Sequence, residues 1–311
     1  MAFKNRDLLS IRDFSKAEIL HIMDVASEMD RSLKAKDRKY SRALEGSVLA
    51  SLFFEPSTRT RLSFEAAMNY LGGRVIGFSE PSHTSIVKGE SFEDTIRVVD
   101  GYCDIFVMRH PQNFSAMRAA ELAVKPVVNG GDGTNEHPTQ TLFDLYTIMK
   151  NFRSMENLKV GFLGDLKYGR TVHSLSFALA LFHPVFYFIS PKSLALPAQY
   201  MDGLVKAGVE CHEEEDLMKV GDRLDILYVT RIQKERFINP KDYQAVKGVY
   251  QIDRSFLSHA KDSLRIMHPL PRVDEINPQL DRAPQSIYFQ QAHNALPVRM
   301  AVLALILGAV E

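Results

Sequence analysis

Short apolar runs alternate along the chain with segments in which apolar residues recur at helical spacing. The clearest run, residues 48–54, is followed at i, i+3, i+4 and i+7 by Phe64, Ala67, Met68 and Leu71. Comparable runs lie at 74–78, 105–108, 127–129, 185–189 and 226–230, and two more begin near residues 159 and 266. Strands that alternate with helices predict parallel sheets, and a length of 311 residues predicts two domains. We therefore expect an α/β protein with two doubly wound parallel-sheet domains and the active site in the cleft between them.

Capping residues predict where several helices begin and end. Ser15 and Glu18 have the spacing of a capping box before the first amphipathic segment. The Ser57 hydroxyl is placed to cap the helix that follows the first run, and two glycines at 72–73 end that helix. Ser91 opens a further helix.

Three other segments have a distinct composition. Residues 79–90 carry too few apolar side chains to fold onto a core, which predicts a long mobile loop. The glycines within 130–133 predict a turn. The segment 297–309 is apolar nearly all round, which predicts a buried last helix between the domains.

The start of the helix after Pro56 combines hydroxyl and guanidinium groups, in Ser57, Thr58, Arg59, Thr60 and Arg61. The free N–H groups and positive dipole of a first helical turn favour an anion, so a basic residue there costs about 0.3–1 kcal/mol. Two arginines placed against that preference indicate that a negative group binds among them. Phosphate fits best, because its oxygens accept hydrogen bonds from backbone, hydroxyl and guanidinium donors together.

Further candidate ligand groups lie at other strand ends and helix starts. Arg109 and Arg231 follow predicted strands, and parallel strands bring their carboxyl ends to one edge. His137 and Gln140 share one face at a helix start, where His137 is placed to donate to an oxygen. Arg170 follows a glycine turn, and its guanidinium suits a carboxylate. The glycines around this turn do not have the G-x-G-x-x-G spacing, which disfavours a dinucleotide cofactor.

Composition excludes several classes of partner. Apolar residues make up 45% of the chain, and 38 Lys and Arg residues balance 38 Asp and Glu residues. A balanced chain has no overall field that would recruit nucleic acid or an acidic membrane, so anion binding has to be local. The two cysteines, Cys103 and Cys211, have no metal-site spacing and suit a reduced, cytoplasmic protein. We expect no cofactor and no metal.

Seven motifs in order along the chain carry a resemblance to a known family. They are FFEPSTRTR (53–61), TSIVKGE (84–90), RHP (109–111), HPTQ (137–140), GDLKYGR (164–170), VTRIQKER (229–236) and MHPLPR (267–272). Together they resemble the catalytic chains of aspartate carbamoyltransferases, within the aspartate/ornithine carbamoyltransferase family, over essentially the full length. The resemblance implies transfer of the carbamoyl group of carbamoyl phosphate to L-aspartate, the committed step of de novo pyrimidine biosynthesis.

The resemblance also implies a role for each motif. The carbamoyl phosphate site would comprise Ser57, Thr58, Arg59, Thr60, Arg109, His137, Gln140, Leu270 and Pro271, with the carbonyls of Pro269 and Leu270 receiving the carbamoyl amide and the attacking amine. The aspartate site would comprise Lys88, Arg170, Arg231 and Gln233. Catalysis would depend on Arg59, Thr60, Arg109, His137 and Lys88.

The implied architecture has three parts and is shared between subunits. Residues 1–136, completed by a C-terminal helix at 290–311, would bind carbamoyl phosphate; 137–152 would link the domains; 153–289 would bind aspartate. Ser85 and Lys88 would reach in from the neighbouring subunit of a homotrimer, to which separate regulatory chains can dock. Glu55 would pair with Arg170 and Arg236 on domain closure.

Two alternative functions stay open on the sequence. An ornithine carbamoyltransferase has the same phosphate turn, but its late motif reads Cys-Leu-Pro where this chain has His268-Pro269-Leu270-Pro271. A non-catalytic scaffold of the same fold would have lost motif residues, and none is lost here. Valine at 87 stands where some relatives place a second basic residue.

Overall fold

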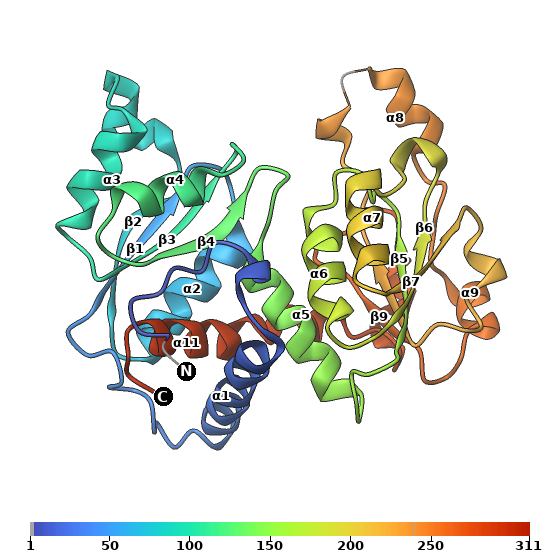
Figure 1. The fold of residues 1–311 in the computed structure, drawn as a ribbon, viewed down its shortest axis with the longest axis horizontal. Coiled ribbons are helices and arrows are strands. Elements are labelled where there is room, and N and C mark those ends of the chain that lie inside the picture. Colours follow the sequence, from blue (N-terminus) through green and yellow to red (C-terminus); the bar gives the residue numbers. More distant parts are fainter. Residues whose placement is uncertain (1–2, 238) are drawn as a thin grey trace. The chain divides into compact units, whose positions relative to one another are not determined.

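The computed structural model describes residues 3–237 and 239–311, which divide into two compact units (Figure 1). The first unit comprises Met1–Tyr146 and Asn294–Glu311, and the second comprises Thr147–His293. Each unit contains one parallel sheet with helices on both faces, which confirms the predicted α/β class and the two doubly wound sheets.

The first unit has a four-stranded sheet in the order β2-β1-β3-β4. Its strands are β1 (Val48–Phe53), β2 (Arg74–Phe78), β3 (Ile105–His110) and β4 (Val127–Asp132). Five of the six residues of β1 are buried, as expected for a parallel strand covered on both faces, whereas β2 is a largely exposed edge strand. β4 runs on through residues 130–132, and all six of its residues are buried, so the predicted turn begins only at Gly133 and the other two glycines lie inside the sheet.

Helices cover both faces of this sheet (Figure 1). They are α1 (Lys16–Ala35), α2 (Thr58–Tyr70), α3 (Phe92–Asp100), α4 (Ser115–Leu122), the first part of α5 (Pro138–Asn151) and α11 (Ala295–Ile306). The predicted capping box of Ser15 and Glu18 is present at the start of α1, and Ser91 caps α3. Residues 79–90 are not irregular throughout, because they contain two short 3-10 helices, η2 (Pro81–His83) and η3 (Ser85–Lys88).

The last helix, α11, lies against α1 and α2 in the first unit. It begins two residues before and ends three residues before the predicted bounds of 297–309. Its residues from Pro297 to Ile306 are all buried, which explains why it is apolar nearly all round. Arg299 is the exception in composition: it is a charged residue that is only 1% exposed.

The second unit has a five-stranded sheet in the order β7-β6-β5-β8-β9. Its strands are β5 (Lys159–Leu163), β6 (Val185–Ile189), β7 (Glu210–Glu214), β8 (Ile226–Val229) and β9 (Arg265–Met267). Strand β7, with the sequence ECHEE, was not predicted, because an exposed edge strand of charged residues has no apolar run.

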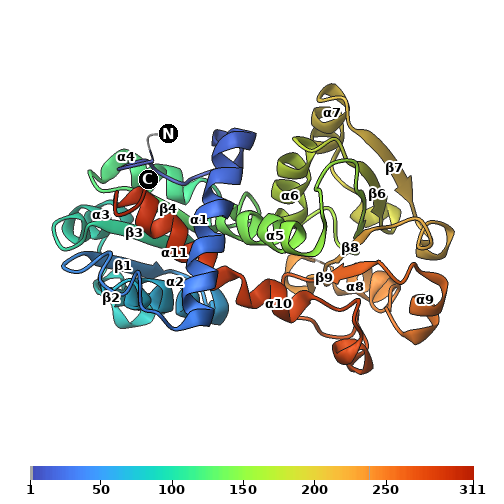
Figure 2. The ribbon, with the colours of Figure 1, turned by 90° about the horizontal axis from the view of Figure 1, so that it is seen from below.

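Helices again lie on both faces, with α6 and α7 on one side and α9 and α10 on the other (Figure 2). The helices are α6 (Arg170–Ala180), α7 (Ala198–Lys206), α8 (Pro240–Val246), α9 (Arg254–His259) and α10 (Tyr288–His293), with a 3-10 turn η6 (Lys234–Arg236). One hydrophobic core of this unit includes Leu227, Ile252, Ile266 and Ile276, all fully buried.

Candidate functional site

The strand order of the first unit creates a switch point between β1 and β3. The chain leaves β1 towards β2 on one side, and β3 lies on the other side of β1. Ligands of open parallel sheets bind outside the carboxyl ends of the strands at such points. The segment after β1 carries the predicted phosphate residues, and Arg109 at the end of β3 lies in register with Phe53. The topology alone therefore brings Arg109 beside residues 57–61, the predicted phosphate turn.

The first turn of α2 has the features of an anion site. Ser57 occupies the N-cap position but makes no capping hydrogen bond, so the predicted cap is wrong and the hydroxyl can serve a ligand. No acidic residue lies in this turn to balance the dipole. Thr58 and Arg59 are exposed, whereas Thr60 is 6% exposed and points into the unit.

A buried hydroxyl–imidazole contact joins α2 to the start of α5. Thr60 Oγ1 lies 3.3 Å from His137 Nε2, and His137 Nδ1 lies 3.4 Å from Thr139 Oγ1. Gln140, also buried, donates from Nε2 to Asp144 at 2.9 Å. The structure thus brings Thr60 and His137, which are 77 residues apart, into one polar group.

Arg109 is held by Glu55 within the same unit. Its Nε donates to Glu55 Oε1 at 2.7 Å, and both side chains are half-buried. This contact uses one of the five N–H donors of the arginine side chain. The predicted ion pairs of Glu55 with Arg170 and Arg236 join residues of different units and stay a prediction.

Arg299 is a site residue that the sequence analysis missed. It donates to the carbonyl oxygen of Thr60 at 3.2 Å and to Ser63, and its guanidinium lies 4.5 Å from the ring centre of Phe64. Burial, and then the charge of Arg109, lower the pKa of Arg299 to about 9. A second positive charge therefore lies directly behind the phosphate turn. The available signal was a single charged residue inside an otherwise apolar helix.

The second unit has its own switch point between β5 and β8. The chain leaves β5 towards β6 and β7 on one side and later returns to β8 on the other. Arg170 is the first residue of α6, and Arg231 follows directly after β8 and Thr230; both are half-buried. The side-chain amide of Gln233 donates to the Tyr168 carbonyl at 3.3 Å. These three predicted site residues thus flank one switch point.

Asp165 organises the backbone at this point and was not assigned a role from the sequence. It is fully buried, its N–H donates to Thr230 Oγ1 at 3.1 Å, and its carboxylate accepts the Tyr168 N–H at 2.9 Å. Burial raises the pKa of Asp165, and it outweighs the backbone N–H groups that donate to the carboxylate and the charge of Arg236, both of which lower the pKa. The carboxylate is therefore committed to the backbone, and the arginines set the charge of the surrounding surface.

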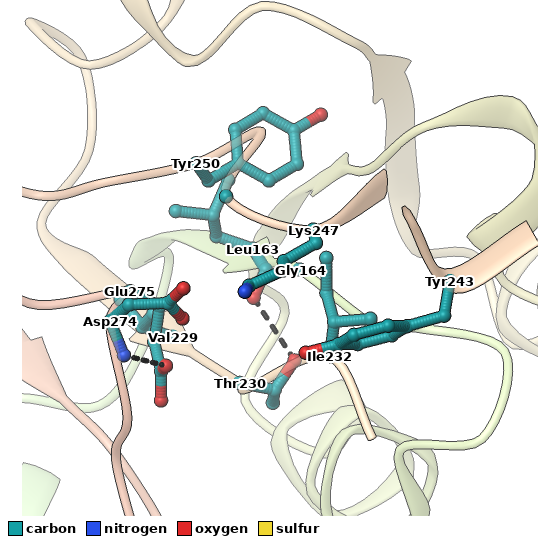
Figure 3. A pocket seen from close by; sticks show the side chains of 11 residues that line it. Leu163, Gly164, Val229, Thr230, Ile232, Tyr243, Lys247, Tyr250, Asp274 and Glu275 are labelled. Atoms are coloured by element: carbon teal, nitrogen blue, oxygen red, sulfur yellow. Dashed lines mark hydrogen bonds between the residues drawn. The ribbon is translucent and has the colours of Figure 1, made fainter. Parts of the chain in front are cut away.

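A narrow cavity of about 20 Å³ lies beside these residues, with Thr230, Tyr243, Lys247 and Glu275 among the side chains that line it (Figure 3). This volume admits about one water molecule and is too small for an amino acid. The loop that carries Pro269, Leu270 and Pro271 follows β9 next to this cavity.

Ser85 and Lys88, both on η3 in the first unit, are exposed.

Comparison with known proteins identifies the family. The family model described as "Aspartate/ornithine carbamoyltransferase, carbamoyl-P binding domain" matches residues 6–150, and the model of the Asp/Orn binding domain matches residues 156–306. The chain belongs to the aspartate/ornithine carbamoyltransferase family.

Individual members of this family match over their full length. The aspartate carbamoyltransferase catalytic subunit of Thermococcus onnurineus is 53% identical and is covered completely by the match, as is this chain. The solved catalytic subunit of M. jannaschii aspartate transcarbamoylase is 50% identical, with 96% of this chain and 97% of that chain covered and a TM-score of 0.89. The Trypanosoma cruzi enzyme in complex with carbamoyl phosphate and aspartate is 37% identical, with 98% of each chain covered and a TM-score of 0.93.

Within residues 3–237 and 239–311, no helix has the length and apolar character needed to cross a bilayer. In the same part of the chain, no group of three or more His, Cys, Asp or Glu side chains is arranged to hold a metal ion.

Proposed function

We propose that this carbamoyltransferase transfers the carbamoyl group of carbamoyl phosphate to the amino group of L-aspartate, giving N-carbamoyl-L-aspartate and phosphate. The observation that carries the proposal is the chemistry at the two switch points. The first has hydroxyl, imidazole and guanidinium donors around a helix N-terminus, which suits a phosphate. The second has two arginines and an amide, which suits a dicarboxylate rather than a cationic amino acid.

The first unit is proposed to bind the carbamoyl donor. Ser57, Thr58, Arg59 and Thr60 hold the phosphate, while Thr60, Arg109 and His137 polarise the carbonyl oxygen. Gln140 and the loop residues Pro269, Leu270 and Pro271 complete the donor site. The contact between Thr60 and His137 supports this assignment, because it holds both donors in place before the substrate arrives.

The second unit is proposed to bind aspartate through Arg170, Arg231 and Gln233, with Lys88 added from a neighbouring subunit. The amine attacks the carbonyl carbon, the bond to the phosphate oxygen breaks, and phosphate leaves with the bonding electrons. The amine proton passes either to the leaving phosphate or to Lys88. Preorganised donors at the carbonyl oxygen and phosphate stabilise the developing charge, and each is worth about 2.7–4 kcal/mol in barrier. No covalent intermediate with the enzyme is needed.

A paired variant tests the phosphate site. Arg59→Ala is expected to lower kcat/KM for carbamoyl phosphate about 100–1,000-fold, because it removes one donor to the transition state. Arg61→Ala is the matched control, since the Arg61 guanidinium is paired with Glu65 at 3.2 Å within α2. Production of carbamoyl-aspartate would be measured with aspartate, and separately with ornithine as the second substrate. Activity of Arg59→Ala within tenfold of the parent, or a preference for ornithine, would refute the assignment.

Subunit sharing of the site is a further part of the proposal. The exposure of Ser85 and Lys88 is compatible with a role in a neighbouring subunit of a homotrimer. Inactive Arg59→Ala and Lys88→Ala enzymes, dissociated and reassembled together, should regain activity because mixed trimers contain sites with both residues intact. Recovery no greater than that of the separate variants would contradict a shared site.

Regulatory chains are the last proposed partner. The resemblance implies that such chains dock at residues 109–112 and the helix that follows. A surface hollow of about 300 Å³ lies at this segment, and its lining includes Phe92, His110, Phe114 and Met117. Phe114 is 55% exposed and Met117 is 48% exposed, which is unusual for such apolar side chains. Mass measurement of the purified complex with a candidate partner would test this. The cytoplasmic location and the place in pyrimidine biosynthesis stay predictions.

A further inference from the structure

The loop after β9 is held at both ends by one buried pair of side chains. His268 begins the loop and is 1% exposed, and Glu275 ends it and is 6% exposed. His268 Nε2 lies 2.6 Å from Glu275 Oε1. Removing an imidazole and a carboxylate from water is costly, and a well-packed apolar pair is often as stable or more stable. Stability alone therefore does not account for this pair.

Hydrogen bonds to the loop backbone define the state of both groups. His268 Nδ1 accepts the Leu270 N–H at 2.8 Å, so the ring proton lies on Nε2 and is donated to Glu275. The second oxygen of Glu275 accepts the N–H groups of Val273 and Asp274, each at 3.1 Å. Figure 3 shows the contact with Asp274. Burial raises the pKa of Glu275, but the hydrogen bonds from His268 and from the loop backbone lower it, and the net shift is downward, so the carboxylate is ionised.

The pair controls most of the donors of the loop. Pro269 and Pro271 have no N–H, and three N–H groups of the remaining residues up to 274 bind His268 or Glu275. The carbonyl oxygens of Pro269 and Leu270 accept no hydrogen bond from residues 3–237 or 239–311. The loop thus turns its donors to the pair and leaves two acceptors for a ligand.

Leu270 shows that this backbone conformation is imposed. Its φ angle is 55°, in the left-handed region that costs an ordinary residue about 1–2 kcal/mol. Such residues persist where their surroundings determine the backbone, and they cluster at ligand sites. The bond from the Leu270 N–H to His268 is one such determinant.

We propose that Glu275 and His268 are positioning residues, which set the backbone of Pro269 and Leu270 so that their carbonyls receive the N–H groups of the carbamoyl donor and of the attacking amine. This inference rests on the proposed function. Neither side chain touches the reactants: Glu275 fixes the ring of His268, and the ring fixes Leu270.

Glu275→Gln preserves shape but breaks the chain of hydrogen bonds. If the amide oxygen accepts from His268, the NH₂ group faces the N–H donors of Val273 and Asp274. If the amide turns over, the NH₂ faces His268, whose proton then has to move to Nδ1, where it opposes the Leu270 N–H. Either arrangement leaves a buried donor unpaired. Glu213→Gln makes the same chemical change on β7, at the opposite edge of the sheet, and serves as the control.

Two substitutions of His268 separate its contacts. In His268→Asn the amide oxygen can replace Nδ1 and accept the Leu270 N–H, but the contact with Glu275 is lost. In His268→Gln the longer amide can donate to Glu275, but no acceptor remains for Leu270. We expect kcat/KM for carbamoyl phosphate to fall about 10–100-fold in Glu275→Gln and His268→Gln, and clearly less in His268→Asn. The inhibition constant of inorganic phosphate should stay unchanged, because phosphate binds the first unit.

The outcomes distinguish the two proposals. A parent enzyme that makes no carbamoyl-aspartate refutes the proposed function, and this inference falls with it. With an active parent, folded Glu275→Gln and His268→Gln enzymes that keep the parental kcat and KM overturn the inference alone. Equal losses in His268→Asn and His268→Gln also overturn it, as does a loss accompanied by an equally weakened phosphate inhibition. If Glu275→Gln does not fold, the pair of His268 variants decides.

Discussion

Gly164→Ala is the sharpest test of the second switch point, because it changes no chemical group of the site. Gly164 has a φ angle of 113°, and a Cβ atom there would lie 2.2 Å from the carbonyl oxygen of Thr230. Since Cβ contacts under 3.0 Å essentially do not occur, β5 and β8 have to separate by at least 0.8 Å at this point (3.0 minus 2.2). The displaced carbonyl is on the residue immediately before Arg231.

The expected cost has two parts. The backbone conformation costs alanine about 1–3 kcal/mol, and the forced separation adds about 1–3 kcal/mol. Gly208→Ala is the matched control, because Gly208 in the same unit has a φ angle of 79° but nothing within 4 Å of the added Cβ. It should lose only the strain of a left-handed residue, about 1–2 kcal/mol.

The functional consequence follows from the position of Arg231. A shift approaching 1 Å in a substrate-positioning group costs up to about 100-fold in rate. We expect Gly164→Ala to raise KM for aspartate or lower kcat by ten- to a hundredfold, with inhibition by inorganic phosphate unchanged, and Gly208→Ala to keep parental kinetics. Unfolding by denaturant would report the stability of both variants. A Gly164→Ala enzyme with parental stability and aspartate kinetics would refute the close approach of the two strands and its role in placing Arg231.

Three other predictions address single residues. Arg231→Ala should raise KM for aspartate more than tenfold and leave phosphate inhibition intact, as measured by steady-state kinetics. Weakened phosphate inhibition with an unchanged KM for aspartate would contradict the assignment of Arg231 to the aspartate site. Burial raises the pKa of the Cys211 thiol to about 11, so at pH 8 its thiolate fraction is about 100-fold below that of a thiol with the ordinary value of 9.0, and labelling by a thiol reagent should be correspondingly slow. Because the pKa of Arg299 is lowered in the folded state, its charge costs stability below about pH 9, and bound phosphate should relieve this cost. Arg299→Met should therefore show a smaller rise in melting temperature with added phosphate than the parent, and an undiminished rise would contradict the role of its charge.

The sequence predicted the elements whose residue pattern is dictated by burial. The buried strands β1, β5, β6 and β8 have continuous apolar runs, and strand–helix alternation is enough to predict the two parallel sheets. Strand β7 escaped prediction because its neighbours in space, and not its own residues, make it a strand. The glycines at 130–131 read as a turn for a similar reason: their burial inside β4 depends on pairing with β3.

For the candidate site, the sequence indicated the residues that could face a ligand. Strand ends and helix starts indicated Arg59, Arg109, His137 and Arg231 directly, because hydroxyl and guanidinium groups stand out there. The residues that hold the site in place could not be predicted in the same way. Asp165, Glu275 and Arg299 each make at least one contact with a residue 7 to 240 positions away, and such contacts leave no local pattern.

These supporting residues share a physical property that strengthens the assignment of the site. Arg299 is a buried charge whose pKa is lowered by burial and by a second arginine, Asp165 is a buried carboxylate whose pKa is raised, and Leu270 has a left-handed backbone. Each departs from what stability alone would favour, and they lie behind the carboxyl ends of β1, β5 and β9. Departures of this kind are expected where a sequence gives up stability for function. On the proposed function, phosphate would offset the first of them directly, since it would bring negative charge to a turn backed by two guanidinium groups, and this would tie Arg299 to the proposed substrate as well as to the fold.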